Sequence, residues 1–292
     1  MTKPPLSLDP ARSWLADQIR SRVIGDEPDA KAADVMLTPG PRWFAEDSVI
    51  REVHADAAMF IGGLRALLLQ TLHPLAMAGV AGHSDYRADP WGRLQRTADF
   101  LAATTFGPIP MAERAIGVVQ RVHSRVQGVA SDGRPYSAND PHLLGWVHVA
   151  EMDSFLAAHQ RYGARRLTRD DVDSYLRDCA FVAEKLGVID APRTSTELRA
   201  QLRKYRSELR GGREARESAR FLLLEPPLPL AARAPYALLA AAAVSLLPGW
   251  ARWPLRLPLL PVSEAVLVKP AGAAVTQLIR WSLGSGTAPH RS

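Results

Sequence analysis

The sequence predicts an all-α protein built as a single multi-helix globular domain. Signals that start and end helices recur from about residue 45 to 225, and no long run alternates apolar and polar residues as a half-buried strand would. Short polar connections containing Gly or Pro separate the helical stretches, as expected for helices that pack as near neighbours. We expect an N-terminal helical extension over 1–40 and the all-α domain over 41–292, with an apolar C-terminal third.

The predicted helices of the first half each carry a start or stop signal. Asp56 can cap a helix that stops before His73-Pro74, and Asp89-Pro90 supplies a cap and a first-turn proline to the next. Gly107 and Gly128 follow apolar-periodic stretches as helix-ending glycines. The helices expected on these grounds span 58–72, 91–106, 111–127 and 142–162.

Two capping boxes open further helices in the second half. Thr168 is followed three residues later by Asp171, and Thr194 by Glu197, so each pair can satisfy two backbone N–H groups reciprocally.

The apolar stretch over 236–247 lies between Pro235 and Pro248 and is too short to cross a bilayer, which needs about 20 residues. We expect a buried helix here, with shallow membrane contact as the alternative. Three prolines interrupt 253–261, which predicts an irregular packed connection.

Net charge places limits on the partners. The chain has 36 basic and 30 acidic residues, giving +6, and the segment 199–220 alone holds eight bases against three acids. Bases spaced by three and four residues indicate a solvated helix face with local ion pairs, and contact with anionic lipid or another acidic surface is the alternative. No nucleic-acid motif accompanies the segment, so a nucleic-acid partner is not expected.

The number of cysteines and the first residues of the chain indicate the cellular compartment. Cys179 is the only cysteine, which excludes an internal disulfide, a cysteine zinc site and an iron–sulfur cluster. It lies in a helix-like stretch and is interpreted as a buried apolar residue rather than a nucleophile. The opening MTKPPLSLDPARSW has no apolar run, so a cytoplasmic location is expected, with membrane association left open.

His123 is the first candidate ligand. Ile116, Val119, His123 and Val126 follow the helical period, so the imidazole shares the stripe that should face inward. Burial keeps the ring neutral, and a neutral ring nitrogen is what a metal requires. The alternative is a core histidine with both nitrogens hydrogen-bonded.

Arg93, Arg96 and Thr97 form a second candidate group. Offsets of three and four residues place them on one side of the 91–106 helix, where they could hold an anion, a cofactor carboxylate or bound dioxygen. The alternative is an exposed basic face.

His148 and Glu151 are three residues apart and could meet one metal ion in a non-heme centre. The sequence supplies few further inward carboxylates nearby, so a supporting hydrogen bond or a surface pair is favoured. Neither a Gly-x-Ser-x-Gly elbow nor a phosphate-binding glycine motif follows a predicted strand, which sets aside triad and nucleotide chemistry.

Two long segments resemble the MpaB-type oxygenase family, which is distantly similar to the latex-clearing proteins, or rubber oxygenases. The segments are RWFAEDSVIREVHADAAMFIGGLRALLLQTLHPLAMAGVAGHSDYRADPWGRLQRTADFLAATTFG and GRPYSANDPHLLGWVHVAEMDSF. The resemblance covers roughly 42–225 well and the apolar C-terminal third more loosely. It implies an all-α fold of the rubber-oxygenase type.

The resemblance also implies a heme b whose iron is held by one histidine, with dioxygen as co-substrate and a hydrophobic, isoprenoid or alkene substrate. His123, in His123-Ser124-Arg125-Val126-Gln127, occupies the place of the family's ligand histidine, with His148 and His73 in reserve. Arg93-Leu94-Gln95-Arg96-Thr97 matches the family's distal Arg-x-x-Lys-Thr run. Arg93 could orient a heme propionate and Thr97 could hydrogen-bond bound oxygen.

Arg96 departs from the family pattern by replacing its lysine, and a permanently protonated guanidinium coordinates iron poorly. We therefore expect an open or water-filled distal side. The family's distal glutamate has no assigned match here. The competing hypothesis is a non-catalytic helical carrier of an apolar ligand.

Overall fold

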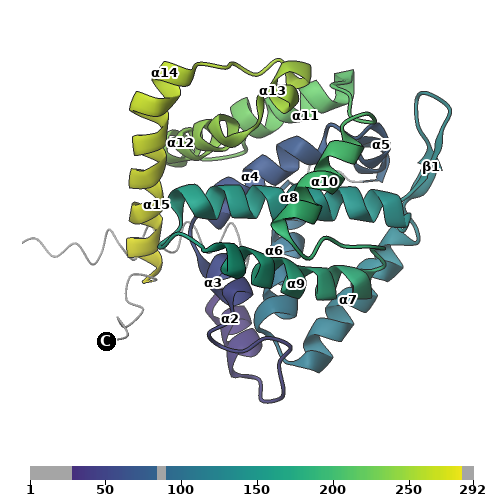
Figure 1. Ribbon diagram of the computed structural model, residues 1–292, viewed down its shortest axis with the longest axis vertical. Coiled ribbons are helices and arrows are strands. Elements are labelled where there is room, and N and C mark those ends of the chain that lie inside the picture. Colours follow the sequence, from purple (N-terminus) through teal and green to yellow (C-terminus); the bar gives the residue numbers. More distant parts are fainter. Residues whose placement is uncertain (1–27, 84–89, 285–292) are drawn as a thin grey trace, which may run out of the picture.

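The computed structural model describes residues 28–83 and 90–284 and confirms the all-α fold (Figure 1). The chain is 71% helical, and the described part contains one two-stranded antiparallel hairpin. Residues 1–27, which make up most of the predicted N-terminal extension, lie outside the described residues.

The helices and strands follow in chain order. Those of the first half are α2 (Pro28–Leu37), α3 (Val49–Ala55), α4 (Met59–Gln70), α5 (Pro74–His83), α6 (Pro90–Phe106), α7 (Ile109–His123), β1 (Gln127–Val129) and β2 (Pro135–Ser137). Those of the second half are α8 (Pro141–Tyr162), α9 (Arg169–Leu186), α10 (Ser195–Tyr205), α11 (Arg213–Leu224), α12 (Leu230–Leu246), α13 (Gly249–Leu255), α14 (Pro261–Ser263), the π-helical turn η1 (Glu264–Val268) and α15 (Lys269–Leu283).

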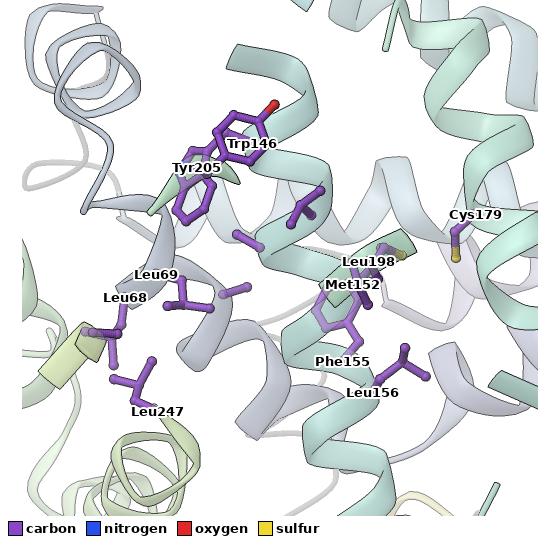
Figure 2. Packing of buried hydrophobic residues seen from close by; sticks show 14 of the residues in the cluster. Leu68, Leu69, Trp146, Met152, Phe155, Leu156, Cys179, Leu198, Tyr205 and Leu247 are labelled. Atoms are coloured by element: carbon purple, nitrogen blue, oxygen red, sulfur yellow. The ribbon is translucent and has the colours of Figure 1, made fainter. Parts of the chain in front are cut away.

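Helix α8 runs through the middle of the molecule and packs most extensively against α4 (Figure 1). Its start is fixed by Asp140, whose side chain accepts the N–H of His142, and by Pro141 in the first turn. Trp146 and Phe155 are buried on it, within the cluster drawn in Figure 2. Residues on nearly all sides of α8 are buried, so the other helices are arranged around it.

Gly62 sets the distance between α4 and α8. A Cβ atom at this position would lie 3.0 Å from the Phe155 ring, 3.2 Å from the Phe155 Cα and 3.3 Å from the Ala158 side chain. The absence of a side chain on α4 therefore allows the two helix backbones to approach closely.

The predicted helix over 111–127 was too long. Helix α7 ends at His123, and the chain turns into strand β1, which contains Gly128. Gly128 is not a helix cap: a Cβ atom there would lie 2.8 Å from the Tyr136 hydroxyl on the partner strand. A glycine required for close packing gave the same sequence signal as a glycine that ends a helix.

The C-terminal third differs from expectation at two points. Helix α12 begins at Leu230, so Pro235 lies inside it rather than before it, and its Ala242 and Ala243 are buried against neighbouring helices. The prolines of 253–261 were expected in a packed connection, but Trp253 is 86% exposed and Leu259 60% exposed.

Candidate functional site

His123 is the last residue of α7 and lies on its inward face. Ile116 is buried and Val119, His123 and Val126 are partly buried, whereas Val118 and Val122 are exposed, as the periodicity predicts. Burial lowers the pKa of His123 below its usual value, so the ring is neutral near pH 7. Its Nδ1 atom is buried and has no hydrogen-bond partner among the described residues. This unpaired nitrogen favours the ligand interpretation over the alternative of a core histidine with both nitrogens hydrogen-bonded.

The predicted distal residues lie on α6, which packs against α7. Gly107 and Pro108 join the two helices, and both Arg93 and His123 lie about 20 Å along the helix axes from that connection. They therefore occupy the same end of the helix pair. The side chains of Arg96 and Thr97 are exposed, and the Arg93 side chain lies outside the described residues.

His148 is buried on α8, and Glu151, one turn further along, is partly buried. His148 is 6% exposed, its Nε2 atom has no hydrogen-bond partner in the described structure, and burial lowers its pKa to about 4. Burial raises the pKa of Glu151 to about 7, and its Oε1 atom accepts a 3.2 Å hydrogen bond from Gln70 Nε2. The described residues hold no group of three metal-ligand atoms within 4.8 Å of one another that includes either residue.

A buried polar group that the sequence did not reveal adjoins these residues. The two ring nitrogens of His54 bond to the Thr105 hydroxyl at 2.8 Å and to the Tyr175 hydroxyl at 3.1 Å. Burial lowers the pKa of His54 to about 4. Tyr175 also interacts with Cys179, and burial raises the pKa of that thiol, which confirms Cys179 as an inert core residue. These partners come from α3, α6 and α9, so no local spacing could indicate them.

His73, the other reserve ligand, belongs to a separate cluster. It is 1% exposed, and its Nε2 atom lies 3.3 Å from Glu208 Oε2. The same carboxylate oxygen lies 2.8 Å from His142 Nε2. The Nε2 atom of His73 therefore has a polar partner, whereas His123 Nδ1 and His148 Nε2 have none among the described residues.

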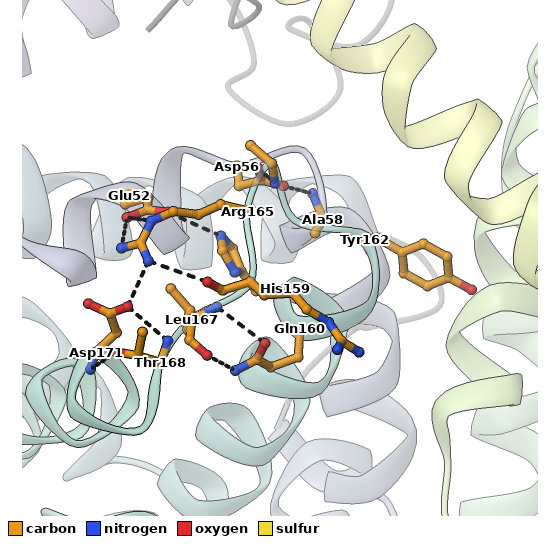
Figure 3. A network of polar contacts seen from close by, with 12 residues as sticks. Glu52, Asp56, Ala58, His159, Gln160, Tyr162, Arg165, Leu167, Thr168 and Asp171 are labelled. Atoms are coloured by element: carbon orange, nitrogen blue, oxygen red, sulfur yellow. Dashed lines mark hydrogen bonds and ion pairs between the residues drawn. The ribbon is translucent and has the colours of Figure 1, made fainter. Parts of the chain in front are cut away.

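His159, at the other end of α8, is a third histidine that the sequence gave no reason to select. Both of its ring nitrogens are buried without a hydrogen-bond partner, and Nε2 lies 4.0 Å from Glu52 Oε1 (Figure 3). Glu52 is itself engaged by the Arg165 guanidinium at 2.7 Å. This region is an ion-pair network close to the surface rather than an apolar pocket.

Two surface hollows of about 410 and 330 Å³ border α9 and α10, and neither is lined by a histidine. The larger is lined by Glu184, Asp190, Ala191, Arg193, Glu197 and Gln201. These polar linings do not suit a hydrophobic substrate.

Comparison with known proteins identifies a family for this all-α chain. Searches of curated proteins and of solved structures each gave no match. A family model described as "ER-bound oxygenase mpaB/B'/Rubber oxygenase, catalytic domain" matches residues 51–281. The match includes α3 to α13, all the candidate histidines and most of α15. The chain therefore belongs to the mpaB/rubber oxygenase family and carries its catalytic domain.

Proposed function

We propose that this protein is a heme-b-dependent oxygenase that uses dioxygen to oxidise a hydrophobic, isoprenoid or alkene substrate, with His123 as the iron ligand. Membership of an oxygenase family supports the reaction class. The observation that carries the cofactor assignment is the neutral, inward-facing imidazole of His123, whose Nδ1 atom is buried and unpaired. Leaving a buried polar atom unpaired costs about 1–3 kcal/mol, so such an atom in a native protein calls for an explanation.

The residues present fit a heme group at this end of the α6–α7 pair. A neutral imidazole is a good donor to iron, and the apolar residues Ile116 and Val119 lie on the same face of α7 as His123. Bound heme would supply the activation of dioxygen, which no side chain can perform.

The chain's own residues would position the reactants. Arg93 would pair with a heme propionate, and Thr97 would offer a hydroxyl for hydrogen bonding near the group. Arg96 would hold a fixed positive charge there without ligating iron. His148, with its buried and unpaired Nε2 atom, is the reserve ligand.

The test is the absorbance spectrum of heme-replete protein. Wild type should show a Soret band at about 400 nm, and His123→Ala should lose it while circular dichroism stays helical. His123→Gly with added imidazole should regain the band. The matched control is His83→Ala, because His83 is exposed and its Nε2 atom donates to the Gln127 carbonyl at 3.0 Å.

Three outcomes would contradict the proposal. An unchanged spectrum in His123→Ala, or loss of the band in His148→Ala instead, overturns the ligand assignment. Colourless protein that carries co-purified lipid would favour the carrier hypothesis.

The hydrophobic substrate suggests a membrane source, and the surface offers a docking site. Six exposed apolar residues form what we call the apolar ridge: Trp253, Leu259, Leu260, Val262, Val266 and Leu267. Figure 1 shows α13 and α14 at the top of the molecule; from α14 the chain continues through η1 into α15. Six large apolar side chains exposed within 253–267 favour a surface that binds an apolar partner.

The basic segment contacts α13, the helix that also holds the exposed Trp253 of the ridge. The Arg206 guanidinium lies over the Trp250 ring, and Arg216 Nε donates to the Pro254 carbonyl at 3.1 Å. Cationic side chains beside exposed Trp and Leu match the headgroup and acyl layers of an anionic bilayer. We propose that this ridge rests on a membrane surface.

One described helical segment, Pro261–Leu283, is long and apolar enough to cross a membrane by length and composition. It lies outside the apolar stretch 236–247 that the sequence pointed to. Two bent helix pairs would pass the same test if each counted as one span. Because Thr276, Arg280 and Ser282 on α15 are buried against the protein body, contact along the surface is the arrangement we propose.

A further inference from the structure

We infer that His73, His142 and Glu208 form a binding site for a divalent transition-metal ion, separate from the proposed heme site. Their ligand atoms all lie within 4.8 Å of one another. Glu208 Oε2 lies 3.3 Å from His73 Nε2 and 2.8 Å from His142 Nε2. Zn²⁺ binds imidazole nitrogen and carboxylate oxygen at about 2.0–2.2 Å, so ligand atoms at these separations can converge on one ion after small side-chain adjustments.

Three separate elements bring the ligands together. His73 precedes α5, His142 lies in the first turn of α8, and Glu208 follows α10. Two hydrogen bonds fix their backbones: the Tyr205 hydroxyl donates to the His142 carbonyl at 2.9 Å, and the Arg210 N–H donates to the Leu72 carbonyl at 2.7 Å. The three side chains are therefore held in place before any ion arrives, which lowers the ordering cost of binding.

The site is accessible on one side and supported on the other. His142 is 53% exposed and Glu208 36% exposed, whereas His73 is buried. The buried ring packs beside Trp146, with ring centroids 6.2 Å apart, and the His142 ring packs beside Tyr205 at 4.8 Å. An ion could enter from solvent and keep one or more water molecules at the open positions.

The His73 tautomer has to change when the ion binds. The Ala76 N–H points at His73 Nδ1 from 3.5 Å, so in the metal-free protein the proton resides on Nε2, which donates to Glu208. Coordination through Nε2 moves the proton of the neutral ring to Nδ1 and gives up the contact with Ala76. This contact is at the outer limit of a hydrogen bond, so its loss costs little.

The ligand set restricts the metal. Two imidazoles and one carboxylate suit Zn²⁺, and the same combination with open positions binds non-heme Fe²⁺. Hard cations such as Mg²⁺ and Ca²⁺ prefer all-oxygen sites and should bind poorly. Nearby positive charge is compensated, because Arg134 pairs with Asp132 at 2.7 Å.

Isothermal titration of the full chain with Zn²⁺, and anaerobically with Fe²⁺, tests the site. We expect one ion per chain, no heat with Mg²⁺, and weaker binding in His142→Ala and Glu208→Gln. Loss of a residue that only hydrogen-bonds to a metal ligand already lowers metal affinity by about 10-fold. Loss of a direct ligand should therefore lower the affinity at least as much. Both variants alter side chains at least one-third exposed, so they should fold; His73→Ala, which alters a buried ring, is a secondary variant.

Two controls separate this site from the heme proposal. His83→Ala removes an exposed histidine outside the cluster and should leave Zn²⁺ affinity unchanged. His123→Ala should lose heme yet bind Zn²⁺ normally, so the two proposals can fail independently. Equal Zn²⁺ affinity in wild type, His142→Ala and Glu208→Gln, or no binding of Zn²⁺ or Fe²⁺ to wild type, would overturn the site.

Discussion

Asp56 and Arg280 form a buried ion pair although 224 positions separate them in the sequence. Arg280 Nη2 lies 2.7 Å from Asp56 Oδ1, and the two side chains are only 7% and 6% exposed. The same carboxylate accepts the N–H groups of Ala58 at 2.7 Å and Ala164 at 3.0 Å (Figure 3). One side chain thus joins the start of α4, the loop after α8 and the C-terminal helix α15.

Asp56→Asn should lower the free energy of unfolding by about 3–5 kcal/mol, because it leaves the Arg280 charge buried without a counter-charge. Urea unfolding followed by circular dichroism measures the change. Asp56→Asn combined with Arg280→Met should be more stable than Asp56→Asn alone. As a control, Arg213→Ala removes an exposed ion pair with Glu217 and should leave the midpoint almost unchanged.

Gly62→Ala and Gly63→Ala form a matched pair on α4. Alanine favours a helix over glycine by about 1 kcal/mol at either position. At Gly62 the new methyl group would press on the Phe155 backbone and the Ala158 side chain, whereas at Gly63 it meets nothing within 4 Å. We expect Gly63→Ala to raise the melting temperature and Gly62→Ala to lower it. Gly62→Ala should reduce the free energy of unfolding by about 1–3 kcal/mol. Equal shifts in one direction would contradict the close α4–α8 contact.

Glu151 should make the protein less stable as the pH rises. Its pKa is about 7 in the folded protein and 4.5 as the unperturbed group, so between these values the unfolded chain gives up the proton first. The decrease in the free energy of unfolding begins near pH 4.5 and levels off above pH 7. Glu151→Gln keeps an acceptor for Gln70 but cannot ionise.

The unfolding free energy of Glu151→Gln should therefore exceed that of wild type by about 2–3 kcal/mol at pH 8 and match it near pH 4. Urea titrations at the two pH values measure the difference. Glu113→Gln, which alters an exposed side chain on α7, is the control and should show no such pH-dependent gain. A pH-independent difference for Glu151→Gln would mean that the carboxyl ionises normally.

The apolar ridge can be tested with vesicles. Trp253→Ser and Leu260→Ser should each reduce co-sedimentation with vesicles that contain anionic lipid, because both side chains are more than half exposed and would lose their insertion into the acyl layer. Ile189→Ser alters an equally exposed apolar residue on the α9–α10 connection and should bind as wild type does. Binding that survives both ridge substitutions would place any membrane contact elsewhere.

Local patterns determined the helical scaffold. The capping box of Thr168 and Asp171 forms as predicted. At α10 only half of the predicted box forms: Thr194 accepts the Glu197 N–H, but the Glu197 carboxylate accepts from the Arg193 N–H instead of the Thr194 N–H. The spacing of Ile116, Val119 and His123 correctly placed the imidazole on the inward face of α7. Such features depend on residues within a few positions of one another, so the linear order of the chain contains them.

Contacts between distant segments were decided by the tertiary structure alone. Asp56 could be recognised as a capping residue, but its pairing with Arg280 depends on how α15 packs against α8 and α12. Glu208 meets His73 and His142 from positions 135 and 66 residues away, and no spacing in the sequence indicates that meeting. The solvent exposure of a proline-rich stretch also depends on contacts with distant segments. Trp253 and its neighbours were expected in a packed connection, but they are exposed. Periodicity fixes the direction of a side chain relative to its own helix, whereas its partners depend on the packing of the whole chain.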